Sequence, residues 1–485
     1  MKRNFKEYNQ QQNWLFPPSI EELIPEDHPV RIVNGVIEHL DLKPLIRAYS
    51  KDGQPSYHPK MMLKVMVYAY MDNTYSTRKI EKAMRENINF MDVFKDIFKQ
   101  VVLLLAQEGL VKLKEVYTDG TKIESVAGRY TFVWGNALKT QKEKMARQLE
   151  EMWEYAQSIA DEEDTDPTPP DFKKVDKEKV EKTAQKIDKI LKGNPKASSK
   201  AKAKARYIAK NFPANLEKYE QQEQLLGNRS SYSKTDPDAT FMRMKEDHMK
   251  NGQLKPGYNV QISSEDQFIV NYTLHQDTND IHTLRPHLEN YEYLYQNLPE
   301  TLTADAGYGS QENYELLSEK GIKGYVKFNT FDKEQNKAGK KRKEKAPFHR
   351  DQLYYNEKED HYVCPMGQRM EKIAQATKTT KSGYRQTVSK YSAKNCNGCP
   401  IRNVCFKGKY NRVIERNHAL EHYKQKAREH LLSEIGEIKR RKRTADVEPV
   451  FAHIKSNRNF KRFTHRGLDK VELEFGLHAL AHNMR

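Results

Sequence analysis

Apolar residues recur at helical spacing in the first hundred positions of the chain. Val93, Ile97 and Val101 fall four residues apart, and a second apolar run extends over residues 61–70 behind Pro59. Apolar side chains at this spacing form one face of a helix, and proline is favoured in a first helical turn. The pattern predicts an N-terminal helical domain over residues 1–110, for which a plain helical bundle and a DNA-reading module are both open.

From about residue 111 the pattern changes to short β-favouring runs. Two of these runs deliver an aspartate to a predicted strand end, Asp119 and Asp305, and a glycine follows each within two residues, which allows a sharp turn. The other predicted elements are a hairpin with strands at 258–262 and 268–272, a helix over about 280–296, a helix over 311–319 with Ser310 as N-cap, and a strand at 324–328.

Two charged segments interrupt this series. Residues 137–160 and 172–226 are rich in Lys, Glu, Gln and Ala, which suits solvent-exposed helices, and residues 161–170 between them have the composition of a linker. Near the end of the chain, apolar residues at helical spacing begin at Val447, beside Glu448.

Without the insertions, the order of the elements is that of a ribonuclease-H-like mixed α/β sheet. In that sheet the first and fourth strands are neighbours, and the last strand–helix–strand unit is a parallel crossover. Asp119 and Asp305 would then converge, although 305 − 119 = 186 positions separate them. The predicted core comprises residues 111–136, 231–335 and 421–485, with a helical insertion at 137–230 and a second insertion at 336–420.

The charge balance indicates a polyanionic partner. The 485 residues include 84 Lys and Arg against 67 Asp and Glu, a net charge of +17. Nucleic acid is the foremost candidate, because Lys and Arg release counterions from phosphates. A membrane surface is the rival, but the longest aliphatic run, residues 101–106, is too short to span a bilayer, and no apolar signal-peptide region follows the first residues. We expect a cytoplasmic protein without a membrane partner.

Three carboxylates stand out in this basic chain: Asp119, Asp305 and Glu448. Carboxylates on rigid elements suit Mg²⁺-dependent chemistry on phosphodiesters, because Mg²⁺ prefers oxygen ligands. Each acid alone is more often a solvated or capping carboxylate. The predicted adjacency of the first two is the physical reason to consider them as a pair.

All four cysteines, Cys364, Cys396, Cys399 and Cys405, fall within 42 residues. This spacing can supply four thiolates to a tetrahedral Zn²⁺ ion. We interpret residues 336–420 as a zinc-ribbon-like insertion with a structural zinc site. Free thiols and disulfides are the alternatives, and disulfides need an oxidising compartment.

A series of short motifs runs along nearly the whole chain. They are Asp27-His28-Pro29, Tyr57-His58-Pro59, Ser76-Thr77-Arg78, Arg85-Glu86-Asn87, Asp119-Gly120-Thr121-Lys122, Thr235-Asp236-Pro237-Asp238, Tyr258-Asn259-Val260-Gln261, Asp305-Ala306-Gly307-Tyr308, Val447-Glu448-Pro449-Val450-Phe451, Arg466-Gly467-Leu468 and Ala481-His482-Asn483. In this order they resemble the DDE transposases of bacterial insertion sequences, in the branch with a cysteine-rich insertion before the last acid.

The resemblance implies an enzyme that cuts DNA at the ends of its element and joins the 3′-hydroxyls to target DNA. It implies Asp119, Asp305 and Glu448 as the catalytic triad, holding two Mg²⁺ or Mn²⁺ ions, and it implies that residues 1–110 bind DNA. The expected partner is double-stranded DNA, both terminal inverted repeats and target, bound by a homodimer at the bacterial nucleoid.

A basic run before the last acid is expected to contact DNA phosphates through Lys439, Arg441 and Arg443, although a solvated helix end is the plain alternative. Lys455 lies two helical turns after Glu448, on the same face, and is expected to join these contacts.

The chain departs from the family pattern in two places, and the second departure supports an alternative against which the three intact acids argue. Thr444 stands where relatives often carry an arginine, with Arg443 the nearest substitute, and a helix-turn-helix-like stretch is missing after Met91. In this alternative the chain is a catalytically silent DNA-binding protein, derived from a transposase by internal deletion. A third hypothesis is an ordinary ribonuclease-H-like nuclease.

Overall fold

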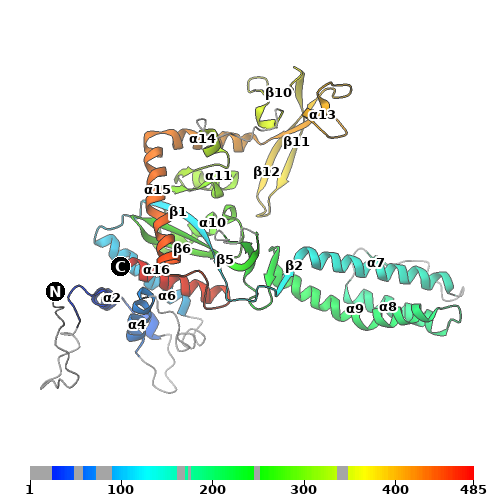
Figure 1. Ribbon diagram of the computed structural model, residues 1–485, viewed down its shortest axis with the longest axis horizontal. Coiled ribbons are helices and arrows are strands. Elements are labelled where there is room, and N and C mark those ends of the chain that lie inside the picture. The colour runs from blue at the N-terminus through cyan, green and yellow to red at the C-terminus, as the bar shows by residue number, and fades with distance from the viewer. Residues whose placement is uncertain are drawn as a thin grey trace, which may run out of the picture. The chain divides into compact units, whose positions relative to one another are not determined.

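The computed structural model describes residues 24–47, 58–72, 90–160, 170–172, 176–244, 252–335 and 348–485. The chain divides into two compact units, residues 1–104 with 476–485 and residues 105–475 (Figure 1). No helix in the described segments combines the length and apolar character needed to cross a membrane. The predicted features outside the described residues are the motifs at 76–78 and 85–87, Tyr57, and the linker at 161–169.

The first unit is helical, as predicted. α4 (Pro59–Met71) and α6 (Phe90–Gln107) confirm the two helices expected from apolar spacing. α2 (Pro29–Glu38) packs against α4, and α3 (Lys43–Arg47) lies between these two helices in the sequence. Residues 476–485 belong to this unit, and the ring of His478 meets that of Tyr70 edge-on, with 4.8 Å between centroids.

The second unit is built on a six-stranded mixed sheet with the order β4–β5–β1–β7–β8, in which β6 also pairs with β5. β5 runs antiparallel to β1, and β7 runs parallel to both β1 and β8. The first and fourth core strands are therefore neighbours, as predicted, and the sheet is consistent with a ribonuclease-H-like fold. The strands are β1 (Glu115–Glu124), β4 (Thr240–Arg243), β5 (Leu254–Glu265), β6 (Phe268–His275), β7 (Thr301–Ala304) and β8 (Lys323–Val326).

The prediction that the first strand ends at Asp119 is wrong. β1 continues through Gly120, and its pairing with β5 extends to Glu124. The parallel pairing with β7 is shorter, and its last pair is Thr118 with Ala304. Asp119 and Asp305 are the residues that immediately follow this pair on the two strands, so the expected adjacency holds although β1 continues.

Two helices near the end of the chain pack against the strands of the sheet. α15 (Glu434–Ala452) packs against β1, β5 and β7, and α14 (His418–Leu432) packs against β8. Asp446 of α15 is buried and accepts hydrogen bonds from Ser264 Oγ at 2.6 Å and from the Gln267 amide at 3.2 Å, which holds α15 on the β5–β6 hairpin. The other helices of the core are α10 (Leu284–Tyr295), α11 (Gln311–Glu319), α12 (Phe331–Gln335), the π-helical turn His453–Asn457 and α16 (Leu468–Asn483).

Two sequence details are confirmed at atomic level. Ser310 caps α11, since its side chain accepts a hydrogen bond from the Asn313 amide at 3.2 Å. The predicted hairpin is present with a shorter connection than expected, because only Asp266 and Gln267 separate the strands. Both have positive φ, 51° and 68°, as a tight two-residue hairpin turn requires.

His287 of α10 is buried under the sheet and holds three polar side chains. Its ring nitrogens contact Thr273 Oγ1 at 2.7 Å, Ser263 Oγ at 2.9 Å and Asn271 Nδ2 at 3.3 Å. Burial lowers the pKa of His287 to about 3 from 6.5. The neutral ring is therefore the form that the fold accommodates.

We expect the stability of this unit to fall as pH is lowered from 6.5 towards 3. In that window an unfolded His287 binds a proton that the folded one does not, so each pH unit costs up to about 1.4 kcal/mol. Urea unfolding between pH 4 and 7.5 measures this slope. His287→Gln should show a shallower slope than the wild type, and parallel slopes would contradict this origin of the pH dependence.

The predicted helical insertion is a three-helix bundle formed by α7 (Gly135–Ile159), α8 (Lys177–Gly193) and α9 (Ser199–Leu226) (Figure 1). At its base β2 (Phe132–Trp134) pairs with β3 (Ser231–Ser233). The bundle has its own apolar core, which includes Leu149, Trp153, Ile187, Ile208 and Leu216. Packing within the insertion therefore holds its three helices together.

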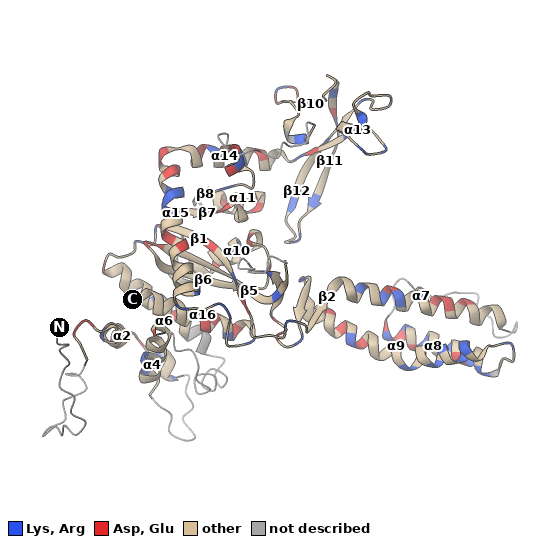
Figure 2. Ribbon diagram, in the orientation of Figure 1, with Lys and Arg blue, Asp and Glu red and all other residues tan. Residues whose placement is uncertain are grey.

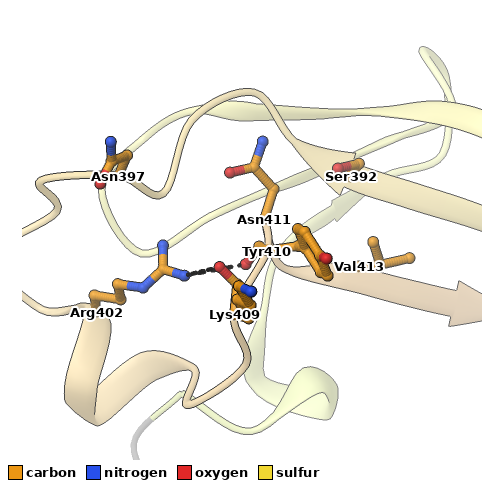
Figure 3. Close-up of a pocket in the computed structure, with 7 residues that line it drawn as sticks. All are labelled: Ser392, Asn397, Arg402, Lys409, Tyr410, Asn411 and Val413. Carbon is orange, nitrogen blue, oxygen red and sulfur yellow. Dashed lines mark hydrogen bonds between the residues drawn. The ribbon is translucent and has the colours of Figure 1, made fainter.

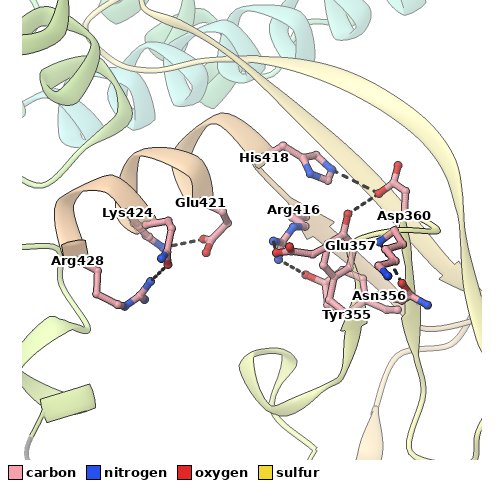
Figure 4. A network of polar contacts seen from close by, with 12 residues as sticks. Tyr355, Asn356, Glu357, Asp360, Arg416, His418, Glu421, Lys424 and Arg428 are labelled. Atoms are coloured by element: carbon pink, nitrogen blue, oxygen red, sulfur yellow. Dashed lines mark hydrogen bonds and ion pairs between the residues drawn. The ribbon is translucent and has the colours of Figure 1, made fainter. Parts of the chain in front are cut away.

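The second insertion contains a five-stranded antiparallel sheet in the order β13–β12–β11–β10–β9. A polar network links this sheet to α14 (Figure 4): Asp360 accepts from Tyr355 at 2.6 Å and lies 3.8 Å from His418, while the Arg416 guanidinium covers the Tyr355 ring at 3.9 Å. The elements of this segment are β9 (Tyr355–Asn356), β10 (His361–Val363), β11 (Arg369–Thr379), β12 (Arg385–Ala393), α13 (Arg402–Cys405) and β13 (Val413–Arg416).

Candidate active site

Asp119 and Asp305 lie side by side where β7 ends against β1. Each carboxylate accepts a hydrogen bond from a nearby glycine amide: Gly120 donates to Asp119 Oδ1 at 2.8 Å, and Gly307 donates to Asp305 Oδ1 at 2.7 Å. The backbone thus orients both side chains at one edge of the sheet. The structure brings this predicted pair together.

Glu448 is linked to Asp119 through Arg443, and both Glu448 and Arg443 lie on α15. The Arg443 guanidinium lies 3.5 Å from Asp119 Oδ2 and 3.1 Å from Glu448 Oε1. The side chains of Arg443 and Asp119 are 14% and 12% exposed, whereas that of Glu448 is 48% exposed. Arg443 Nη1 is buried and has no hydrogen-bond partner among the described residues. The guanidinium therefore compensates two of the three predicted acids at once.

A fourth acid, Asp280, borders the same site. Its Oδ1 accepts from Asn259 Nδ2 at 2.8 Å and from Gln261 Nε2 at 3.1 Å, and both donors project from β5. A Cβ atom at Gly120 would come within 2.3 Å of Gln261 Nε2 and 2.9 Å of Asp280 Oδ1. A side chain at position 120 would therefore clash with Gln261 and Asp280. The sequence predicted that Gly120 allows a sharp turn, but its role in the structure is to let these two side chains approach the strand.

Tyr308 closes the floor of the site. It is fully buried and donates a hydrogen bond to Gln261 Oε1. Burial raises the pKa of Tyr308 well above its ordinary value, and the negative charges of Asp280, Asp119 and Asp305 add to the effect. All three acids are therefore close enough to influence the same neutral phenol.

The carboxylates do not form a closed metal cage in this structure. Within the described segments, no group of three or more His, Cys, Asp or Glu side chains has the arrangement of a metal site. The donor chemistry of the two aspartates nevertheless fits a hard cation, because Asp119 and Asp305 follow neighbouring positions of the β1–β7 pair and offer carboxylate oxygens.

The basic residues predicted to contact phosphates fall into two groups. Lys439 is buried and pairs with Glu115 at 2.5 Å, and Lys455 is buried and donates to Thr121 Oγ1 at 3.2 Å. Both ammonium groups therefore serve contacts within the protein, and their burial does not suit the predicted role on DNA. Arg441, by contrast, is 86% exposed and only loosely paired with Glu437 at 3.8 Å.

The four cysteines do not assemble into the predicted zinc site. None is in a disulfide, and no three of them form a metal-binding group in the described part of the chain. Cys364 and Cys396 pack against the small core of the five-stranded sheet, and the buried Arg412 donates to Cys405 Sγ at 2.8 Å. This arrangement of the described cysteines therefore does not support the predicted zinc site.

Arginine hydrogen bonds hold the cysteine-containing loop together. Arg402 donates to the carbonyl oxygens of Cys396 at 2.6 Å, Gly408 at 2.9 Å and Lys409 at 2.9 Å. Figure 3 shows this side chain at the rim of a polar pocket of about 420 Å³. The pocket is lined by Ser392, Asn397, Arg402, Lys409, Tyr410, Asn411 and Val413.

Two segments of the chain match known families. Residues 363–485 match the family described as Transposase DDE domain, and residues 18–101 match Transposase domain (DUF772). The two matches indicate a DDE transposase of the insertion-sequence type. No curated protein and no solved structure matches this transposase. The DDE match contains Glu448 and Arg443, whereas Asp119 and Asp305 lie outside it.

Some residues around these acids have no sequence signal of their own. Asn259 and Gln261 belong to the motif Tyr258-Asn259-Val260-Gln261, which indicates no role for them, and Asp280 stands outside all of the motifs. Their relation to Asp119 and Asp305 appears only when the register of β5 against β1 is known, since Gly120 pairs with Gln261.

Proposed function

We propose that the chain cleaves DNA at the ends of its element and transfers the strands to target DNA in a reaction that depends on divalent metal. Asp119, Asp305 and Glu448 are the catalytic residues in this proposal. The observation that carries it is the adjacency of Asp119 and Asp305 at the end of the parallel β1–β7 pair. Two carboxylates held at the end of this rigid strand pair can act on the same phosphodiester.

Asp119, Asp305 and Glu448 would hold Mg²⁺ or Mn²⁺. The chemistry that such ions supply is activation of a water or 3′-hydroxyl and stabilisation of the leaving oxygen. Asn259 and Gln261 hold Asp280 beside the site, so Asp280 acts as a positioning residue for the Asp305 turn. Arg443 compensates the charges of Asp119 and Glu448. Together with Arg441 it would offer positive charge to the phosphates of DNA bound at the site.

Double-stranded DNA is the proposed partner, and the net charge of +17 supports it. An element has two ends, so a homodimer on DNA at the nucleoid would bring both ends to equivalent sites. Zinc has no part in this proposal, because the cysteines do not fit it.

Purified protein tests the proposal on a supercoiled plasmid that carries the DNA bordering the gene. We expect Mg²⁺-dependent breaks at the element borders that stop in the presence of EDTA, because the phosphodiester chemistry requires the divalent ion. Retained DNA binding without cleavage under Mg²⁺ and Mn²⁺ would instead favour the catalytically silent alternative. Cleavage of RNA–DNA hybrids without border specificity would favour the ordinary nuclease.

A further inference from the structure

One end of the three-helix bundle carries a dense group of cations. Residues 189–210, here called the arm tip, include seven lysines and one arginine and contain neither Asp nor Glu. The segment covers the end of α8, the turn after it and the first half of α9. It supplies +8 of the chain's net charge of +17 in 22 residues. Figure 2 shows the Lys and Arg positions along these helices.

The arm tip is the end of the bundle away from the β2–β3 pair. The side chain of Asn194 donates to the carbonyl of Ile159, so the last residue of α7 lies beside the end of α8. α7 starts directly after β2, and α9 ends shortly before β3. Positions near 159, 194 and 199 are therefore remote from the base, as the lengths of α7 and α9 require.

The charge pattern of the arm tip differs from that of the rest of the bundle. Near the base, opposite charges form ion pairs, such as Lys142–Glu223 and Lys177–Glu217 at 2.9 Å. Mixed charges of this kind suffice to keep an exposed helix soluble. In the arm tip, Lys204 lies 3.4 Å from Glu151 of α7, and Lys192 lies 3.9 Å from Asp188 of its own helix. Eight cations without an acid inside residues 189–210 exceed what solubility of an exposed helix requires.

Five cations of the arm tip are exposed to solvent: Lys192, Lys196, Lys200, Arg206 and Lys210. From Lys200 to Lys210 the helix advances about 15 Å. Cations four residues apart on α9, such as Arg206 and Lys210, have Cβ atoms about 6 Å apart, which is within the roughly 8 Å over which physiological salt screens charges. Their repulsion is relieved when a polyanion replaces many separate counterions.

Duplex DNA fits this surface better than a membrane does. A helix that binds an anionic bilayer presents apolar side chains beside its cations. Tyr207, 56% exposed, is the one large apolar side chain that is exposed among the described residues of the arm tip. A rigid row of cations with little apolar surface matches the phosphate backbone, which is contacted without base recognition.

We propose that the arm tip is a second DNA-binding surface of the transposase, which contacts phosphates independently of base sequence. The inference rests on the proposed function in that DNA is the substrate. It adds a site that lies in neither of the two segments matched to known families. The residues that carry it are Lys192, Lys196, Lys200, Arg206 and Lys210.

The test replaces these five residues with glutamine in the full chain. The matched control replaces five lysines nearer the base, Lys139, Lys144, Lys179, Lys182 and Lys218, so that both variants lose five charges. Binding to a duplex of unrelated sequence is titrated in EDTA from 50 to 300 mM salt. Neither set includes a residue of the bundle's apolar core, and thermal melting confirms that both variants fold.

We expect the arm-tip variant to lose at least about tenfold in affinity at 100 mM salt. Its slope of log affinity against log salt should become shallower by about 0.9 for each phosphate that the variant no longer neutralises, while the control stays near the wild type. Equal behaviour of the two variants would overturn the proposal. Binding to anionic vesicles that depends on the five residues, with unchanged DNA binding, would also overturn it.

This outcome is separable from that of the proposed function. Binding in EDTA does not involve metal-dependent cleavage, so a failed cleavage reaction leaves the arm-tip result unaffected. Conversely, an arm tip that does not bind DNA leaves border cleavage by Asp119, Asp305 and Glu448 intact at low salt.

Discussion

We expect Asp119→Asn, Asp305→Asn and Glu448→Gln each to reduce Mg²⁺-dependent strand cleavage by on the order of 10³-fold or more, which corresponds to about 4 kcal/mol of activation free energy. Each substitution removes the negative charge of one carboxylate and keeps the size of the side chain. DNA affinity should stay within about threefold, because phosphate contacts by cations lie elsewhere. Cleavage of a radiolabelled duplex in single turnover, with a gel shift in parallel, measures both quantities.

Glu289→Gln serves as the control, because Glu289 lies on α10 outside the acid site. It should cleave at the wild-type rate. Near-full cleavage by any of the three site variants would remove that residue from the triad. A variant that loses cleavage and DNA binding together would indicate a folding defect, which its melting temperature would show.

Gly309→Ala is expected to have the second-largest effect. Gly309 has an ordinary φ of −74°, but a Cβ atom there would lie 2.4 Å from the Lys327 carbonyl oxygen and 3.0 Å from Phe328 Cα. These are backbone atoms at the end of β8, so either this strand or the Asp305 turn must shift. We expect about 1–3 kcal/mol of lost stability and roughly a hundredfold loss of cleavage from misplacement of Asp305.

Gly35→Ala is the matched control for this substitution. Gly35 lies inside α2, and a Cβ atom there would meet nothing within 4 Å. Alanine in a helix interior is more favourable than glycine by about 0.5–1 kcal/mol, so this variant should be at least as stable as the wild type. Urea unfolding compares the two. A Gly309→Ala protein with wild-type stability and cleavage would show that the turn tolerates the added atom.

Most of the core could be predicted because local signals agreed with its strand order. Ser310 predicted the N-cap of α11, and short β-favouring runs predicted β5, β6, β7 and β8. The order of these elements matches that of a ribonuclease-H-like sheet, in which the first and fourth strands are neighbours, and this was enough to predict that β1 and β7 lie side by side. The predicted pairing of Asp119 with Asp305 followed from that topology, although no local signal joins them.

The rest depended on contacts that no local pattern encodes. The continuation of β1 past Asp119 results from pairing with β5, which outweighs the turn preference of Gly120. Asp280 enters the site only through the register of β5, and the burial of Lys439 and Lys455 results from packing of α15 and the turn after it. Cysteine spacing allows a zinc site but does not impose one, since Arg412 and Arg402 bond the same loop.

The most direct test of the central claim is to locate the metal on the protein itself. Fe²⁺ replaces Mg²⁺ at oxygen-ligand sites, and with ascorbate and peroxide it cuts the polypeptide beside the bound ion. We predict cuts close to Asp119, Asp305 and Glu448, which excess Mg²⁺ suppresses and Asp119→Asn abolishes. Cuts confined to the cysteine-containing loop, or cuts unaffected by Asp119→Asn, would contradict a metal-dependent site at the β1–β7 edge.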